Sequence, residues 1–224
     1  MAQGRTMELK PGFAWKKLKQ DDFEQIKVFH MEYYLKDEPT DVMLEVDTNE
    51  LDDMECDRIN ECLLQAASLG ITETTSGKLI AMSLNKIRRF EDIALSGNYS
   101  SRETYACKVF KDMHEIFSED LPRFLSGKTI YCIQMLSVHH HYRRMGFMTS
   151  LVAKCEDIAK ELECEYIVVV SSSAFTQRIF ERGKYVKFSE VKFSDFVDPD
   201  SGEKPFKKSH PPHTHTKCYY KQIQ

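Results

Sequence analysis

The sequence has no long apolar run. Its longest apolar segments, such as residues 166–170, have the length of a strand, whereas a membrane-spanning helix needs roughly 18 apolar residues. The first residues, Met1 to Pro11, are polar and lack the apolar core of a secretory signal. We therefore expect a protein that neither crosses a membrane nor enters the secretory route.

Paired cysteine motifs and an excess of basic charge are also missing. The seven cysteines are odd in number, scattered and without a CxxC pair, which favours free thiols in a reducing compartment over a disulfide framework. The formal net charge is −4, whereas a nucleic-acid-binding protein needs a strongly basic face. We expect a cytoplasmic protein that binds neither nucleic acid nor membranes.

What is present is the composition of a globular protein. Of the 224 residues, 42% are hydrophobic and 29% are charged, which suits one folded domain over 1–224, with a flexible start at 1–10. Hydrophobic periodicity and turn residues predict alternating strands and helices. Strands are expected at 15–18, 71–75, 79–87, 129–138, 166–171, 185–196 and 218–223. Helices are expected at 21–36, ended by Pro39, and at 58–68, 103–117, 145–162 and 174–182, with a loop at 91–102. This order predicts an α/β or α+β fold with a mixed sheet, in which the continuous apolar strand 166–171 is central.

The segment from Leu136 to Leu151 carries the clearest chemical signal. An apolar strand ends at Val138, and a short basic loop then leads to Gly146 at the mouth of an amphipathic helix. The first N–H groups of a helix have no internal partners, and a glycine lets an anion approach them closely. Two arginines in the loop add full positive charges, so the segment suits a pyrophosphate. An ordinary strand-to-helix turn with solvated arginines is the alternative. GxxxxGK[ST] and GxGxxG are both absent, which excludes the common nucleotide loops.

This loop resembles motif A of the GNAT superfamily of acetyltransferases, whose core is Gln/Arg-x-x-Gly-x-Gly/Ala at the pyrophosphate of acetyl-CoA. Arg143 and Gly146 match the first two fixed positions, whereas Met148 stands where Gly or Ala is usual. Three further segments are similar to the insect-type arylalkylamine N-acetyltransferases. They are Tyr34-Leu35-Lys36-Asp37-Glu38-Pro39, the serine-rich segment 171–178, and the ending from Pro205 to His213.

The resemblance implies a mixed, mostly antiparallel twisted sheet flanked by helices, with acetyl-CoA as cosubstrate and a small amine as the partner molecule. The implied cofactor-binding residues are Leu136, Ser137, Val138, Arg143, Arg144, Met145, Gly146, Phe147, Met148 and Thr149.

The resemblance also implies the catalytic residues. Glu38 takes the place of the general base that removes a proton from the ammonium; the alternative is a solvated acid at a helix end. Ser172 and Thr176 take the two hydroxyl positions near the reacting sulfur, although serines here also suit a helix cap. Phe180 lies where many superfamily members have a tyrosine general acid, so the acid stays unassigned.

Two clusters invite other interpretations. The histidines at 139–141 and at 210, 213 and 215 lack companion cysteines or a glutamate at a recognised metal spacing, so no metal is expected. Residues 37–57 contain ten acidic residues and no lysine or arginine. Near an amine entrance such a run would attract cations; otherwise it is a solvated acidic loop.

The expected function is therefore acetyl transfer from acetyl-CoA to an arylalkylamine such as dopamine, serotonin or tryptamine, by direct attack of the amine on the thioester. Two alternatives stay open. One is acetylation of a polyamine or another aliphatic amine. The other is a catalytically silent protein that binds acyl-CoA.

Overall fold

A computed structural model describes residues 9–49, 51–89, 108–109, 113 and 120–223 of the chain. The strands are β1 (Phe13–Lys17), β2 (Leu69–Glu73), β3 (Leu79–Arg89), β4 (Thr129–Val138), β5 (Tyr166–Ser171), β6 (Val186–Lys192) and β7 (His215–Gln222). The α-helices are α1 (Phe23–His30), α2 (Pro39–Met43), α3 (Asp53–Leu64), α5 (Leu121–Phe124), α6 (Phe147–Glu161) and α7 (Ala174–Arg182). Shorter turns are η1 (Gln20–Asp22), the π-helical η2 (Met31–Leu35), η4 (His140–Tyr142) and η5 (Phe193–Asp195).

The strands form one seven-stranded sheet in the order β1-β2-β3-β4-β5-β7-β6. All neighbouring strands are antiparallel except β4 and β5, which are parallel. This confirms the expected mixed, mostly antiparallel sheet with β5 in its interior.

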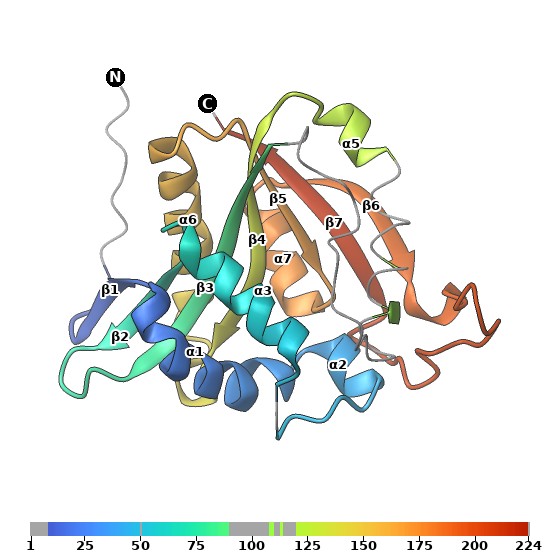
Figure 1. The fold of residues 1–224 in the computed structure, drawn as a ribbon, viewed down its shortest axis with the longest axis horizontal. Helices are drawn as coiled ribbons and strands as arrows, with labels where there is room; N and C mark the ends of the chain where they lie inside the picture. Colours follow the sequence, from blue (N-terminus) through green and yellow to red (C-terminus); the bar gives the residue numbers. More distant parts are fainter. Residues whose placement is uncertain (1–8, 50, 90–107, 110–112, 114–119, 224) are drawn as a thin grey trace.

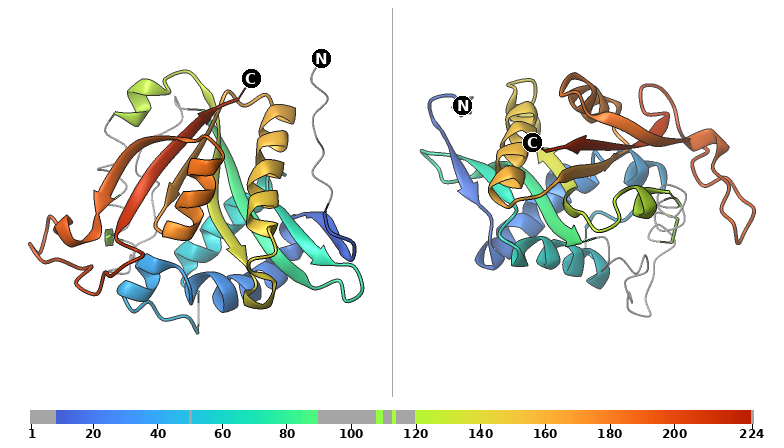
Figure 2. Two further views of the ribbon diagram at one scale, coloured as in Figure 1. Left: turned by 180° about the vertical axis from the view of Figure 1, so that it is seen from behind. Right: turned by 90° about the horizontal axis from the view of Figure 1, so that it is seen from above.

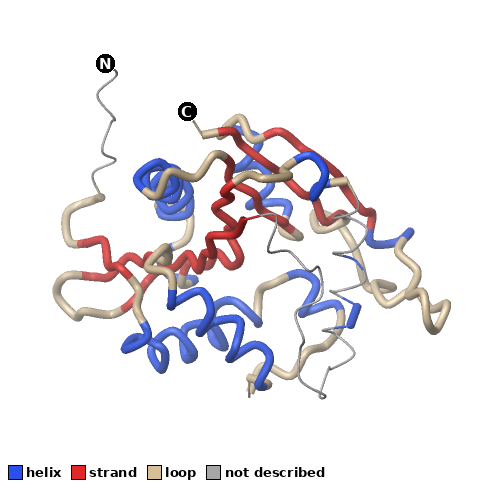
Figure 3. The backbone as a smooth tube through the Cα atoms, turned by 45° about the horizontal axis from the view of Figure 1, so that its top comes forward, coloured by secondary structure: helices blue, strands red, loops and turns tan. Residues whose placement is uncertain are grey.

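Helices cover both faces of the sheet (Figures 1, 2 and 3). The helices α1, α2 and α3 lie on one face, and α6 and α7 lie on the other. Each layer buries apolar side chains: Ile26 and Ile59 are fully buried on the first side, and Leu151 and Phe180 on the second. The sheet is therefore a rigid platform on which both layers position loops at the ends of β4 and β5.

A β-bulge in the middle of β4 opens the sheet. Opposite β3, Ile133 pairs with Asn85 and Met135 pairs with Leu84, so Gln134 is an extra residue on β4. The bulge exchanges the two faces of the strand: Tyr131 and Ile133 share a core with Leu136 and Val138, whereas Met135 packs on the opposite face. Pairing with β5 covers only Ile130 to Ile133, so the two parallel strands part beyond the bulge.

Most strands agree with the sequence predictions, and β4, β5 and α7 agree residue for residue. Several predicted bounds were wrong. The strand expected at 185–196 ends at Lys192, where η5 begins. The single helix at 21–36 is instead divided into η1, α1 and η2, and Pro39 begins α2 rather than ending a helix. The helix expected at 58–68 runs earlier, from Asp53 to Leu64, because the Asp52 side chain accepts from the Glu55 N–H and caps it. The helix α6 begins at Phe147, two residues after the expected start.

Some predictions lie outside the described residues. They concern most of the flexible start at 1–10, the loop at 91–102, and the helix at 103–117 except for positions 108, 109 and 113. No helix in the described ranges is long and apolar enough to cross a bilayer.

Candidate active site

The loop before α6 presents a row of backbone donors. Gly146 is the N-cap of α6 with φ of 91°, and Arg144 also has a positive φ, of 62°. The first backbone N–H to bond in this helix is that of Ser150, which donates to the Gly146 carbonyl. No described group accepts from the N–H groups of residues 144–149. Such a row at a helix N-terminus suits an anion.

The surroundings of Gly146 leave room for that anion. A Cβ placed on Gly146 would meet no described atom within 4 Å. Met148, which departs from the small residue usual in motif A, packs against the apolar core under α6. Phe147 is buried in the same core and meets Phe13 with ring centroids 4.7 Å apart.

The part of β4 that does not pair with β5 precedes this loop in the sequence. Leu136 and Val138 pair with β3 on one side only, because pairing with β5 stops at Ile133. The intervening Ser137 donates its hydroxyl to the Tyr33 carbonyl at 2.6 Å, which ties β4 to η2. The arrangement fits an extended pantetheine arm along β4 and a pyrophosphate at residues 144–149.

Arg143 makes a different contact from the one expected. Its Nε donates to the Val138 carbonyl at 3.0 Å, and its terminal nitrogen lies 2.5 Å from an Asp37 carboxylate oxygen. The two side chains are about half exposed, so the ion pair adds little stability. It does connect the loop before α6 to the segment that carries Glu38.

Glu38 is the N-cap of α2, and three donors point at its carboxylate. The Asp41 N–H donates to Oε2 at 2.8 Å, and the Thr40 hydroxyl donates to the same oxygen. The Ser172 hydroxyl donates to Oε1. Sequence reasoning named Glu38 and Ser172 separately, and the fold brings them into contact from opposite faces of the sheet.

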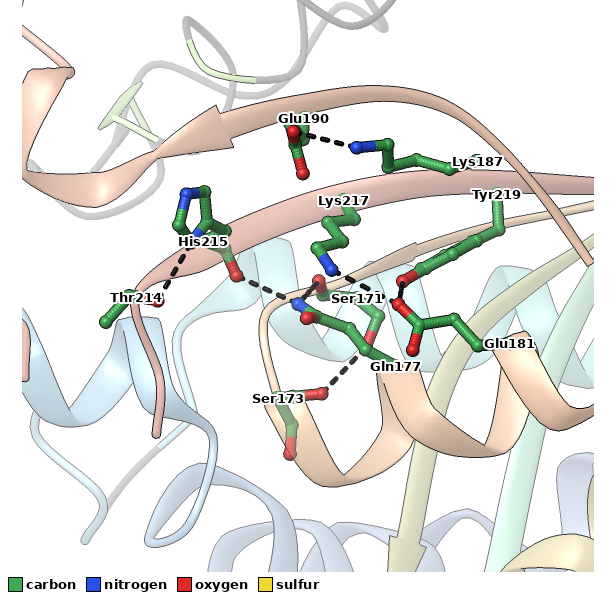
Figure 4. A network of polar contacts seen from close by, with 10 residues as sticks. All are labelled: Ser171, Ser173, Gln177, Glu181, Lys187, Glu190, Thr214, His215, Lys217 and Tyr219. Carbon is green, nitrogen blue, oxygen red and sulfur yellow. Dashed lines mark hydrogen bonds and ion pairs between the residues drawn. The ribbon is translucent and has the colours of Figure 1, made fainter. Parts of the chain in front are cut away.

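A buried glutamine fixes the loop that carries Ser172 (Figure 4). Gln177, only 6% exposed, donates through Nε2 to the Ser171 carbonyl at 2.8 Å and to the His215 carbonyl at 2.9 Å. It therefore joins the end of β5 to the start of β7. Sequence reasoning did not single out Gln177, because an amide on a short helix carries no local signal of its partners.

Thr176 and His213 lie beside this loop. Thr176 is half-buried one turn into α7, and no described group bonds its hydroxyl. His213 accepts a hydrogen bond from the Ala174 N–H at 3.2 Å and meets the exposed Phe175 ring edge-on. Burial lowers the pKa of His213 in spite of the charge of Glu38 nearby, so the imidazole is neutral at pH 7. Sequence reasoning had assigned His213 no role in the site.

Behind Glu38 lies a partly buried polar cluster between η2, α2 and α3. Glu55 contacts Arg58 at 2.7 Å and His30 at 2.9 Å. Burial would raise the pKa of Glu55, but Arg58 and His30 outweigh it and lower the pKa to about 2. Burial also raises the pKa of Tyr34 well above its usual value, with Glu38 acting in the same direction, so the phenol keeps its proton.

The acidic run at 37–57 is therefore more compensated than its sequence indicated. Basic residues from distant segments meet it, since Arg143 contacts Asp37 and Lys208 contacts Glu45. Arg58, which directly follows the run, contacts Glu55 three residues earlier on α3. The partners of Asp37 and Glu45 could not be read from the sequence, because they lie more than 100 residues away along the chain. Asp47, Asp53 and Asp57 are the exposed acids left within its described part without an ion pair.

His139 and most of the cysteines that the structure describes are buried. His139 is buried, with Nε2 3.1 Å from Lys78 Nζ, and its ring stacks on His140 at 4.6 Å. Within the described ranges no three His, Cys, Asp or Glu side chains are grouped as metal ligands. Burial raises the thiol pKa of every cysteine that the structure describes, so none of these is a ready thiolate nucleophile.

Part of the chain matches a known protein family. A model of the "Acetyltransferase (GNAT) family" matches residues 93–183, which include β4, the loop before α6, and α7. The fold is that of the GNAT acetyltransferases. The GNAT resemblance of the sequence is thereby confirmed over these residues. A comparison with curated proteins gives no match.

Several solved structures share the GNAT fold over nearly the whole chain. Arylalkylamine N-acetyltransferase 2 from Aedes aegypti has a TM-score of 0.78 at 18% identity, covering 95% of this chain and 99% of that one. Mosquito arylalkylamine N-acetyltransferase-like 5b has a TM-score of 0.80 at 17% identity, with coverages of 94% and 100%. A polyamine N-acetyltransferase from Drosophila melanogaster, which forms N-acetylagmatine, has a TM-score of 0.77 at 14% identity, with coverages of 94% and 100%.

Proposed function

We propose that this protein is an enzyme that transfers an acetyl group from acetyl-CoA to the primary amine of a small cationic substrate. The observation that carries the proposal is the contact between Glu38 and Ser172 beside the parted strands β4 and β5. The contact brings together a carboxylate at the start of α2 and a hydroxyl that directly follows β5. The GNAT family match and the similar N-acetyltransferase structures support the same reaction class.

In this proposal acetyl-CoA supplies the thioester. Backbone N–H groups of residues 144–149 hold its pyrophosphate, and the free edge of β4 at Leu136 and Val138 aligns its arm. Glu38 accepts a proton from the bound ammonium, directly or through water, so that the free amine becomes a nucleophile. Ser172 holds the Glu38 carboxylate in place, and Thr176 offers a second hydroxyl near the reacting groups.

For the substrate we propose an arylalkylamine such as dopamine, serotonin or tryptamine. The exposed Phe175 ring against His213 offers an aromatic surface close to Ser172. A polyamine remains the second candidate, because Asp47 and Asp53 leave exposed negative charge near Glu38 in the chain. The similar structures include enzymes of both kinds.

A binding assay and a turnover assay test the proposal together. Acetyl-CoA should raise the melting temperature, and adding the right amine should release free thiol from it. A panel of dopamine-like, indole-like and polyamine substrates then identifies the amine class. Stabilisation by acetyl-CoA without thiol release from any amine would instead identify a silent acyl-CoA-binding protein.

Salt dependence separates a monoamine enzyme from a polyamine enzyme. If the acidic run steers its substrate, Asp47→Asn with Asp53→Asn lowers kcat/KM at low salt, and more for a polyamine than for a monoamine. The matched control is Asp21→Asn, an exposed aspartate before α1. An equal loss at low and high salt would leave this segment without a steering role.

A further inference from the structure

Three carboxyl groups, those of Glu38, Asp41 and Glu55, meet at the polar cluster between η2, α2 and α3, and they are not equivalent. The Glu38 carboxylate accepts from the Thr40 hydroxyl, the Asp41 N–H and the Ser172 hydroxyl. The Glu55 carboxylate contacts Arg58 and His30. Each of these two therefore has donors that support a negative charge.

Asp41 has no such support. Its side chain is 93% buried by area, since the residue is only 7% exposed. No described group forms a hydrogen bond or ion pair with its carboxyl oxygens. The charged and titratable groups that face it are Glu38 at the start of α2, Glu55 and Arg58 on α3, and Tyr34 on η2.

The balance of these neighbours disfavours a charge on Asp41. Burial raises the pKa of Asp41 well above its usual value, and Glu38 and Glu55 act in the same direction. Arg58 opposes them, but its guanidinium is already engaged by Glu55 at 2.7 Å. When carboxyl groups share one buried site, the proton goes to the one with the fewest donors.

We propose that Asp41 is a positioning residue that stays protonated behind Glu38 and so keeps the general base ionised. An ionised Asp41 would repel the charge on Glu38 and favour its protonated form, which cannot accept a proton from an ammonium. The inference rests on the proposed function insofar as Glu38 is the base. The protonation of Asp41 itself does not depend on the reaction.

Unfolding experiments test the proton on Asp41 without any substrate. Because the pKa of Asp41 is raised in the folded state, its contribution to the free energy of unfolding is fully present below pH 3.8. This contribution is lost as the pH rises, because only the unfolded chain then releases the proton. Asp41→Asn is neutral at every pH and escapes this loss. The free energy of unfolding of Asp41→Asn minus that of the wild type should therefore grow between pH 4 and pH 7.

Two further variants make this measurement decisive. Asp41→Ala, also neutral, should show the same trend with pH even if its absolute stability is lower. Asp21→Asn, at an exposed position, should show no comparable trend. A wild type that instead gains stability relative to Asp41→Asn over this range would mean an ionised Asp41, and would overturn the proposal.

The pH profile of acetyl transfer tests the effect on Glu38. Asp41→Asn should keep kcat/KM at pH 7 within about threefold of the wild type, with the acidic limb of the profile unmoved. An acidic limb displaced to lower pH would show that Asp41 is charged in the working enzyme and would overturn the proposal. Should no amine be acetylated, the proposed function fails, and the unfolding arm still decides where the proton resides.

Discussion

The Ser172 hydroxyl donates a hydrogen bond to the Glu38 carboxylate across 134 residues of sequence. Glu38 begins a short helix on one face of the sheet, and Ser172 follows β5, just before a helix on the other face. The contact therefore passes through the opening where β4 and β5 part. Any molecule that reaches both side chains lies between the two layers of the fold.

Glu38→Gln should lower kcat by about 10²-fold or more, the scale expected for a lost general base, while acetyl-CoA affinity hardly changes. Ser172→Ala should cost less in the wild type and almost nothing more in the Glu38→Gln background, because the two side chains act as a unit. Ser173→Ala is the control, since that side chain caps no N–H group and does not bond Glu38. Near wild-type turnover of Glu38→Gln at neutral and high pH would remove Glu38 as the base.

Gly146→Ala should weaken acetyl-CoA binding by more than about tenfold, which is 1.4 kcal/mol. The new methyl enters open space at the N-cap of α6, where we propose that the pyrophosphate approaches the backbone. Gly77→Ala is a matched control, because that glycine also has a positive φ and open space around it. Both variants should lose about 1–2 kcal/mol of stability through backbone strain. Equal affinities in calorimetric titrations would contradict a pyrophosphate site at Gly146.

Gln177→Leu should lower the free energy of unfolding by on the order of 1–3 kcal/mol, because two carbonyls lose their buried donor. It should also lower kcat, since the Ser172 loop loses its tie to β7. Arg178→Leu, on the exposed side of the same helix, should change neither quantity comparably. Urea denaturation and steady-state kinetics measure the two effects. An unaltered kcat in a destabilised variant would show that the position of Ser172 does not depend on Gln177.

The stability of the protein should fall as the pH drops below 6.5, in part because of His139. Burial first, and then the charge of Lys78, lower the pKa of His139 to about 4. Between pH 6.5 and 4 the unfolded chain gains a proton that the folded chain refuses. His139→Gln should therefore lose less stability over this range than the wild type, whereas the exposed His140→Gln should follow the wild type. Parallel curves for wild type and His139→Gln would contradict this assignment.

The sequence predicted those elements whose signal is local. The β-branched run of β5 and the amphipathic pattern of α7 are complete in their own residues, and their bounds were correct. The helix at 21–36 was wrong because apolar periodicity continues through the π-helical η2. Pro39 was misplaced because proline disfavours a helix interior but is favoured at the first helical position.

The site was predictable only where residues resemble a known motif. Glu38, Ser172 and Gly146 carried such a signal, and the fold places the first two in contact. The ion pair between Asp37 and Arg143 joins residues 106 apart, and no pattern in either segment indicates the other. His213 likewise gains its place only through the return of β7 to the sheet.

The bulge at Gln134 has a consequence for the lifetime of the protein. Beyond it, a stretch of β4 offers a backbone edge inside the molecule rather than at its rim. Exposed strand edges are templates for pairing with other extended chains, which is a route to aggregation. A bound cosubstrate that covers this edge would prevent such pairing, and its binding would stabilise the folded state by mass action. If acetyl-CoA binds there as proposed, the protein should aggregate or be degraded sooner in a cell starved of acetyl-CoA, and its abundance should follow the supply of this cosubstrate.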